Sequence, residues 1–272
     1  MNDSPTSSNT SAPLLVDISD GVATLTLNRA DAMNGLDIAT KDALVAATAR
    51  VAADDEVRCV VLTGSGRAFC VGQDLKEHVQ LLESGSSEEL FTTVERHYNP
   101  IVHTLLTMPK PVIAAVNGVA AGAGASLAFA CDLRIVADTA GFNLAFAGVA
   151  LSCDTGASWT LPRLVGRAKA MELLLLPETI GATAAADLGL ATRVVPAAEL
   201  AGTVRELAVR LAAGPTMAYA GIRRSVEHSA STSFAEALGF EAEMMRLTGA
   251  SDDHRRAVDA FLAKEKPEFR GR

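Results

Sequence analysis

A run of small residues at positions 117–126 (NGVAAGAGAS) connects an apolar strand to an apolar helix and restricts the folds open to this chain. The preceding residues 112–116 (VIAAV) have the composition of a buried strand, and residues 126–130 (SLAFA) continue as a buried helix. The run between them therefore becomes the N-terminus of a helix. Side chains this small let a ligand, or another segment of the chain, approach the backbone closely.

Two interpretations of this loop are open. Backbone N–H groups in the first turn of a helix have no intrahelical acceptor, and together with the helix dipole they favour a negatively charged oxygen. Such donors would form an oxyanion hole. Small residues are also what tight packing of a helix on a sheet requires. A dinucleotide site is a weaker interpretation, because Gly118, Gly122 and Gly124 lack the spacing and the downstream acidic residue of that fingerprint.

Charge and residue spacing argue against several classes of protein. The formal net charge of −8 disfavours nucleic acid and anionic membranes as partners, since both bind basic surfaces. The 272 residues are enough for one large domain or a domain with a helical appendage. The histidines and cysteines lack ligand spacing, so we expect no metal and reduced, buried thiols at Cys59, Cys70, Cys131 and Cys153. With neither a signal peptide nor a membrane span in the pattern, we expect a soluble, cytoplasmic protein.

Strand and helix patterns alternate over most of the chain, which predicts an α/β fold with mostly parallel strands. Residues 1–13, rich in Ser, Thr and Asn, are expected to form a disordered tail before a core at 14–195. Residues 196–272 have helical patterns and are expected to form a C-terminal helical region. The expected strands are 22–27, 57–62, 112–116, 133–136 and 193–195, and the expected helices are 38–53 after an Asp37 cap, 89–107, 126–130, 200–213, 216–228, 234–247 and 253–264.

A second small-residue turn, at residues 70–73 (CVGQ), also follows an apolar strand. Two such loops can each direct one N–H group at the same carbonyl oxygen. With these loops, the chain resembles the crotonase, or enoyl-CoA hydratase/isomerase, superfamily over residues 14–272. The segments that carry the resemblance are 58–64 (RCVVLTG), 68–75 (AFCVGQDL), 110–118 (KPVIAAVNG) and 161–166 (LPRLVG).

The resemblance implies a crotonase-like spiral core of ββα units and a C-terminal helical trimerisation region, in a homotrimer or a dimer of trimers. It also implies an acyl-CoA substrate, with coenzyme A as part of that substrate and no separate cofactor. The oxyanion-hole donors fall by resemblance on the backbone N–H groups of Gln73 and Ala123. The residues implied in substrate binding are Arg29, Ala68, Val71, Asp74, Leu75, Lys76, Tyr98, Gly122, Ser126 and Phe146.

The acid and base positions depart from those of the hydratases in the superfamily. Two glutamates that hold and activate water there correspond to Ser126 and Phe146, which carry no carboxylate. Asp154, in a mostly apolar stretch, occupies the position of the catalytic carboxylate in several isomerases and a dehalogenase of the superfamily. Desolvation there would raise its pKa and suit a base that takes and returns a proton. The alternative is an aspartate that only caps a helix beginning near Thr155.

The likeness extends furthest to the isomerases of ring-1,2-epoxyphenylacetyl-CoA, which share the loop at 118–125 and the segment 94–100 (VERHYNP). We therefore expect an isomerase in which Asp154 moves a proton through a thioester enolate. Ala150, Cys153 and Ala157 replace the Gly, Pro and Gly of the usual motif, which alters the expected acyl pocket. Hydration of a 2-enoyl-CoA and non-catalytic binding of an acyl-CoA remain the alternatives.

Other polar residues have two interpretations each. His78 and Tyr98 either line the acyl pocket or lie on the surface. Asp132 is interpreted as a structural hydrogen-bonding residue, because it follows a buried helix and opens a strand. Basic residues that either meet the CoA phosphates or are ordinary surface charges are Arg29, Lys76 and Lys264.

Overall fold

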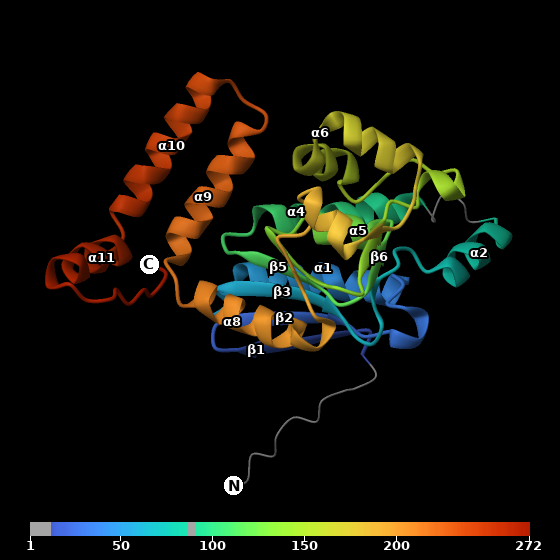
Figure 1. Cartoon of the computed structure of the whole chain (residues 1–272), viewed down its shortest axis with the longest axis horizontal. Helices are drawn as coiled ribbons and strands as arrows, with labels where there is room; N and C mark the ends of the chain where they lie inside the picture. The colour runs from blue at the N-terminus through green and yellow to red at the C-terminus, as the bar shows by residue number, and fades with distance from the viewer. Residues whose placement is uncertain (1–11, 86–90) are drawn as a thin grey trace, which may run out of the picture.

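The computed structural model describes residues 12–85 and 91–272, and these form two β-sheets surrounded by helices (Figure 1). The larger sheet has six strands within the described residues, in the order β1-β2-β3-β5-β7-β10. Its first two strands pair antiparallel and its other neighbours pair parallel. The strands are β1 (Leu14–Ser19), β2 (Val22–Leu27), β3 (Cys59–Gly64), β5 (Val112–Val116), β7 (Leu133–Ala137) and β10 (Arg193–Val195). The predicted α/β class is confirmed.

The smaller sheet has the order β4-β6-β8-β9 in the described part of the chain. Each of the pairs β3/β4, β5/β6 and β7/β8 gives its first strand to the larger sheet and its second to the smaller, and a helix follows each pair. This repetition is the expected ββα spiral. The remaining strands are β4 (Ala68–Cys70), β6 (Val119–Ala121), β8 (Gly141–Asn143) and β9 (Ile180–Gly181), and the helices are α2 (Leu75–Glu83), α5 (Ala123–Phe129) and α6 (Ala157–Leu175).

The spiral brings the two small-residue loops together. Strands β4 and β6 are parallel neighbours, so the segments that leave their carboxyl ends lie at the same edge of the smaller sheet. Those segments begin at Val71 and Gly122, the first residue after each strand. The loops noted in the sequence are therefore adjacent because of sheet order, although about fifty positions separate them along the chain.

Helix α1 (Ile38–Ala53) begins as predicted, with the Asp37 Oδ1 accepting from the Thr40 N–H group at 2.8 Å. Its buried apolar residues include Leu44 and Val51, each fully buried, and α4 (Asn99–Thr107) packs against it. Helix α8 (Leu200–Ala212) packs against β3, β5 and β7 of the larger sheet. The central strands β3 and β5 are buried, as the continuous apolar runs predict for parallel strands.

Some expected elements differ in the structure. Strand β3 begins at residue 59 instead of 57. The strands β1, β4, β6, β8 and β9 were not among those expected; the last four have two or three residues each, too few to show alternation. Of the helix expected at 89–107, residues 89 and 90 lie outside the described residues, and a π-helix, η2 (Val94–Tyr98), precedes α4. Most of the tail expected at residues 1–13 also lies outside the described residues. The Pro13 carbonyl accepts from the Asn28 N–H group at 2.8 Å, which extends the pairing of β1 with β2 by one residue.

The C-terminal helices end within two residues of their predicted bounds, as α9 (Thr216–Ser229), α10 (Phe234–Gly249) and α11 (Asp252–Ala263). Helices α9 and α10 pack against each other and extend away from the two sheets (Figure 1). Helix α8 packs on the larger sheet, so the first helix of the region expected at 196–272 belongs to the core. The domain boundary expected between residues 195 and 196 stays a prediction. Across residues 12–85 and 91–272, every helix is too short or too polar to span a bilayer.

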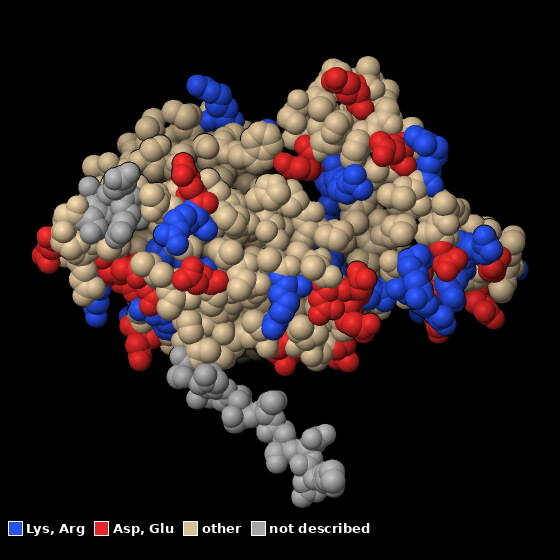
Figure 2. Space-filling view, turned by 180° about the vertical axis from the view of Figure 1, so that it is seen from behind, with Lys and Arg blue, Asp and Glu red and all other residues tan. Residues whose placement is uncertain are grey.

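Charged side chains of both signs lie on the surface. Figure 2 shows acidic and basic side chains interspersed over one face of the molecule, with wide uncharged areas between them.

Replacing Gly118 by alanine is expected to lower the free energy of unfolding by about 1–3 kcal/mol. A Cβ atom there would lie 2.0 Å from the Arg67 carbonyl oxygen, which belongs to a neighbouring backbone segment and has little room to move. Gly202 in α8 is the matched control, because a Cβ atom there meets nothing within 4 Å. We expect Gly202→Ala to stabilise by about 0.5–1 kcal/mol. Urea unfolding of both variants checks this, and equal stabilities would contradict it.

Candidate active site

A cavity of about 470 Å³ opens where the two loops meet. It contains both expected hole residues, Gln73 and Ala123, together with the expected base Asp154. Five other residues predicted in substrate binding also line it, and so does His78. The five are Val71, Leu75, Tyr98, Gly122 and Phe146.

The peptide between Gly72 and Gln73 is held by its carbonyl group. The Gly72 oxygen accepts from the Leu36 N–H group at 2.8 Å, and the Leu36 oxygen accepts from Asp74 N–H at 3.2 Å. Because a trans peptide points its N–H group opposite to its C=O group, this fixes the Gln73 N–H group away from Leu36. Gly72 adopts a φ of +84°, which glycine accepts without strain.

The peptide between Gly122 and Ala123 is held in the same way. Its carbonyl oxygen accepts from both the N–H group and the hydroxyl of Ser126, at 3.1 and 3.0 Å. The Ala123 N–H group therefore points in the opposite direction. Because Ala123 is the first residue of α5, this N–H group has no acceptor within the helix. Within the described residues, neither Gln73 N–H nor Ala123 N–H has a hydrogen-bond acceptor. Two unpaired donors thus lie at the cavity wall, which is the chemistry of an oxyanion hole.

Glycines let the two peptides lie against each other. A Cβ atom on Gly72 would lie 3.2 Å from the Ala123 nitrogen and 2.9 Å from the Ala121 oxygen. One on Gly124 would lie 2.1 Å from the Cys70 oxygen. The tight packing of α5 on the Cys70 segment is therefore what brings the two unpaired donors together.

Asp154 supplies the carboxylate of the cavity. Its Oδ1 accepts from the Thr155 hydroxyl at 2.8 Å, and Thr155 has a φ of +50°, an uncommon conformation for a β-branched residue. Helix α6 has Gly156 at its N-cap without a side-chain cap bond, so the carboxylate does not cap this helix. Burial raises the pKa of Asp154, and the Thr155 hydroxyl opposes this rise without cancelling it.

The raised pKa of Asp154 predicts a change of stability in the variant Asp154→Asn. Between the ordinary aspartate pKa of about 3.9 and the raised value, the folded chain holds a proton that the unfolded chain releases. The free energy of unfolding therefore falls as pH rises through this window and remains lowered at neutral pH. An asparagine side chain carries no charge, so we expect D154N to melt at a higher temperature than the unmodified chain at pH 7, with the difference shrinking in acid. Thermal melts across pH test this, and a lower Tm for D154N at pH 7 would contradict it.

The rest of the cavity wall is mostly apolar. Tyr98 is 1% exposed, and its hydroxyl donates to the Gln73 Oε1 at 2.5 Å. Among the described residues that line the cavity, Asp154 is the single carboxylate. The apolar wall residues are Val71, Leu75, Leu82, Phe91, Phe146, Val149 and Leu151, of which Leu82, Phe91, Val149 and Leu151 were not singled out in the sequence.

Several residues expected to bind substrate lie outside this cavity. Arg29 pairs with Asp37 at 3.1 Å and with Asp74 at 2.7 Å, and Asp74 caps α2 by accepting from the Lys76 and Glu77 N–H groups. Ser126 is fully buried behind the hole, so its expected contact with substrate is corrected to a bond with Gly122. Arg29 and Asp74 thus lie outside the cavity, and their contact with the CoA part of the substrate stays a prediction.

Ala68 and Lys264 are also outside the cavity. The Ala68 carbonyl accepts from the side-chain amides of Asn34 and Asn117, at 2.8 and 3.1 Å. Lys264 is exposed at the C-cap of α11. Asp132 has the predicted structural role, because its carboxylate accepts from Val112 N–H at 2.7 Å and from the Arg223 side chain at 2.8 Å.

Cysteine and histidine positions give no second reactive centre in the described part of the chain. Burial raises the pKa of the Cys59, Cys70 and Cys131 thiols to about 12, so these side chains are protonated at neutral pH. All four cysteines are free, and Cys153 is half-buried. A search of residues 12–85 and 91–272 found no group of three potential metal-ligating side chains.

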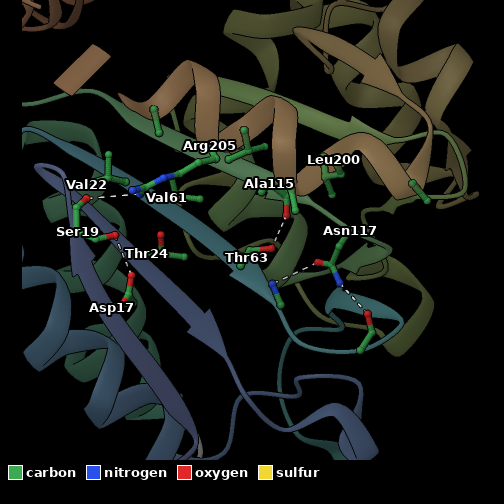
Figure 3. A pocket seen from close by; sticks show the side chains of 16 residues that line it. Asp17, Ser19, Val22, Thr24, Val61, Thr63, Ala115, Asn117, Leu200 and Arg205 are labelled. Carbon is green, nitrogen blue, oxygen red and sulfur yellow. Dashed lines mark hydrogen bonds between the residues drawn. The ribbon is translucent and has the colours of Figure 1, made fainter. Parts of the chain in front are cut away.

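A second cavity, of about 540 Å³, lies between the larger sheet and α8 (Figure 3). At its end Asn117 joins two turns, accepting from Gly64 N–H at 3.2 Å and donating to the Gly66 carbonyl at 3.0 Å. The Thr63 hydroxyl on its floor donates to the Ala115 carbonyl at 2.9 Å. The side chains of Asn117 and Thr63 therefore hold strands and turns together at this cavity.

The fold and the first cavity together define a class of protein. Two sheets built by a ββα spiral, with two unpaired N–H donors at one edge of the smaller sheet and a half-buried carboxylate in the same cavity, are the architecture of a crotonase-type site. The comparison with known families agrees. This chain belongs to the enoyl-CoA hydratase/isomerase family, whose model matches residues 17–272.

Individual relatives have different names within the family. The 1,2-epoxyphenylacetyl-CoA isomerase of Escherichia coli K12 is 42% identical over 259 residues, covering 95% of this chain and 98% of the relative. A Rhodobacter capsulatus protein named "Probable enoyl-CoA hydratase" is 43% identical over 258 residues, covering 94% and 97%. The crystal structure of an enoyl-CoA hydratase from Bacillus anthracis superposes with a TM-score of 0.89 at 29% identity, covering 96% of this chain and 100% of that one.

Proposed function

We propose that this chain is an acyl-CoA isomerase that moves a proton with one carboxylate through a thioester enolate. The observation that carries the proposal is the combination of Asp154 with the unpaired N–H groups of Gln73 and Ala123 in one apolar cavity. One base and one oxyanion hole are sufficient for proton transfer beside a thioester carbonyl.

The reaction follows from these groups. The Asp154 carboxylate takes a proton from the carbon beside the thioester carbonyl, and the electron pair left behind delocalises onto the thioester oxygen. The Gln73 and Ala123 N–H groups donate to that oxygen while it is negatively charged. Asp154 then returns its proton to another carbon of the conjugated system, and the carbonyl re-forms. Atoms and charge balance without a co-reactant, so the product is an isomer of the substrate.

The cavity also supports a substrate with a ring in its acyl group. Phe91, Tyr98 and Phe146 line it together with aliphatic side chains, and flat rings pack well on such walls. The Escherichia coli relative is named for an isomerase of 1,2-epoxyphenylacetyl-CoA. On these two grounds, ring-1,2-epoxyphenylacetyl-CoA is the proposed substrate and its oxepin isomer the proposed product. The carbon–carbon bond shared by the epoxide and the six-membered ring breaks as the ring double bonds shift, which gives the seven-membered ring, and the proton transfer moves one double bond into conjugation with the thioester.

Hydration of a 2-enoyl-CoA is the second candidate, favoured by the Rhodobacter capsulatus relative. It would require Asp154 alone to activate a water molecule, since Ser126 and Phe146 stand where the hydratases carry two glutamates. The single carboxylate in the described cavity wall therefore favours isomerisation over hydration.

Mass spectrometry of the products distinguishes the candidates. The protein is incubated separately with ring-1,2-epoxyphenylacetyl-CoA, a 3-enoyl-CoA and a 2-enoyl-CoA, and each product is resolved by chromatography. An isomerase gives a product of new retention time and unchanged mass. A 2-enoyl-CoA product heavier by one water would identify a hydratase and contradict the proposal. No turnover of any ester would favour a non-catalytic acyl-CoA binder.

The assembly and location are proposals as well. We propose a homotrimer, or a dimer of trimers, in which the C-terminal helices lie at interfaces between copies, because these helices expose large apolar side chains such as Phe234, Met245 and Phe261. A cytoplasmic location and the lack of a cofactor other than substrate CoA are proposed with it. Light scattering that finds a stable monomer at micromolar concentration would overturn the trimer.

A further inference from the structure

Lys41 of α1 is a buried cation next to the oxyanion hole. It is 1% exposed, although its side chain ends in an ammonium group. The Nζ atom lies 3.2 Å from Gln73 Oε1, 3.4 Å from Glu77 Oε1 and 5.8 Å from the centre of the Tyr98 ring. Burying a charge costs free energy unless its partners compensate. The partners of this charge come from α2, η2 and the loop that carries the Gln73 N–H group.

The side-chain amide of Gln73 is bonded on both sides. Its Oε1 accepts from Lys41 Nζ and from the Tyr98 hydroxyl, at 3.2 and 2.5 Å. Its Nε2 donates to Glu77 Oε1 at 3.3 Å, and the other oxygen of Glu77 accepts from the Ile38 N–H group at 2.8 Å. Three separate elements therefore fix one side chain, and that side chain belongs to the residue whose N–H group faces the cavity.

The protonation of Lys41 and Tyr98 affects the hydrogen bonds that they make to Gln73. Burial lowers the pKa of Lys41, and the neighbouring Glu77 carboxylate opposes that change. Burial also raises the pKa of Tyr98, so its hydroxyl keeps its proton and remains a donor to Gln73. Each member of the network can therefore hold the hydrogen bond that the structure shows.

We propose that Lys41 and Tyr98 are positioning residues that clamp the Gln73 side chain and thereby hold the Gln73 N–H group in line with the substrate oxygen. The inference rests on the proposed oxyanion hole and not on which acyl-CoA the protein converts. A hole donor acts only when it is aligned with the charge that develops, and small displacements of catalytic groups are costly. The two backbone hydrogen bonds with Leu36 set the general direction of the Gln73 N–H group, and a glutamine free to change rotamer would leave these two bonds alone to hold the turn, so that the Gln73 peptide would tilt about them.

The test compares Lys41→Met with Lys110→Met. Methionine keeps an unbranched stem and removes the ammonium group. Lys110 is a matched control, because it is 3% exposed and its ammonium group binds the Val51 and Asp54 carbonyls, both at 2.8 Å, at the opposite end of α1. Both variants bury an apolar side chain in place of a bonded lysine, so a general loss of packing would affect them alike.

The readout is the absorption of 4-dimethylaminocinnamoyl-CoA bound to the intact protein. Its band moves to longer wavelength when hydrogen bonds polarise the thioester carbonyl, whether or not the ester is turned over. We expect a red shift with the unmodified chain and with Lys110→Met, and a shift at least halved with Lys41→Met at similar affinity. Tyr98→Phe is also expected to reduce the red shift. Combining it with Lys41→Met is expected to reduce the shift little further, since both side chains bond to the same Gln73 amide.

The kinetic result is expected to agree with the spectrum. For whichever ester proves to be the substrate, Lys41→Met is expected to lower kcat about 10- to 100-fold with little change in KM, while Lys110→Met leaves both near normal. An unchanged red shift in Lys41→Met would overturn the clamp, as would equal losses in the two lysine variants. A red shift without isomerisation in the unmodified chain would reject the proposed function and leave the clamp standing. Binding without any red shift would reject the hole and the clamp together.

Discussion

Replacing Asp154 by asparagine is expected to lower turnover of the CoA substrate by about 10²–10⁴-fold. The amide has nearly the same shape and keeps an oxygen that can accept from the Thr155 hydroxyl, but it cannot take a proton from carbon. Binding of the CoA ester is expected to change less than severalfold, because the hole and the apolar wall are unaltered. Turnover is measured by chromatography, and affinity by calorimetry with a non-reactive acyl-CoA.

Asp138→Asn is the control for this variant. Asp138 accepts from the Ala197 N–H group at 3.0 Å and does not line the cavity, so its loss removes a carboxylate without touching the proposed chemistry. Near-normal turnover in Asp154→Asn would remove this residue from the mechanism. Loss of ester binding together with turnover would show that its role is structural.

Replacing Ala123 by proline is expected to lower kcat by about 10²–10³-fold, corresponding to roughly 3–4 kcal/mol for one hole donor. Proline lacks an N–H group, so the variant deletes this donor and leaves the Gln73 donor in place. The substitution suits the helix, because Ala123 is the first residue of α5 and proline is favoured at that position. Activity of the purified, folded variant is compared with the unmodified chain at saturating substrate.

Ala182→Pro supplies a control of matching geometry. Ala182 is also the first residue of a helix, α7 (Ala182–Asp187), also follows a glycine N-cap, and is 4% exposed, as is Ala123. It lies outside the cavity, so kcat is expected to remain within a factor of a few of normal. If both proline variants lost activity equally, the effect would be one of folding, and the Ala123 donor would no longer be supported.

Much of the fold and the two small-residue loops could be predicted from the sequence, because these depend on local patterns. Buried parallel strands appear as continuous apolar runs, and the loop at 117–126 shows its small residues directly. Strand β9 and the π-helix η2 were not predicted, since two residues show no periodicity and a π-helix differs from an α-helix only in its hydrogen bonding.

The role of Ser126 and the contacts of Lys41 could not be predicted from local patterns. The resemblance to the superfamily implied that Ser126 contacts the substrate, whereas its hydroxyl bonds backward to Gly122 within the first turn of α5. Lys41 reads as an ordinary charge on an amphipathic helix, and its partners lie 32, 36 and 57 positions later in the chain. Only the arrangement of α1, α2 and η2 in space brings them together.

The central claim is that one carboxylate moves a proton without adding water, and isotopic labelling tests it most directly. A 3-enoyl-CoA is incubated with the protein in D₂O enriched in ¹⁸O, and the recovered ester and the product are analysed by mass spectrometry. The account predicts a migrated double bond and no ¹⁸O, with deuterium in the ester or the product to the extent that the Asp154 proton exchanges with solvent before it is returned. Incorporation of ¹⁸O into the acyl chain would show that water is the nucleophile, and would contradict the account.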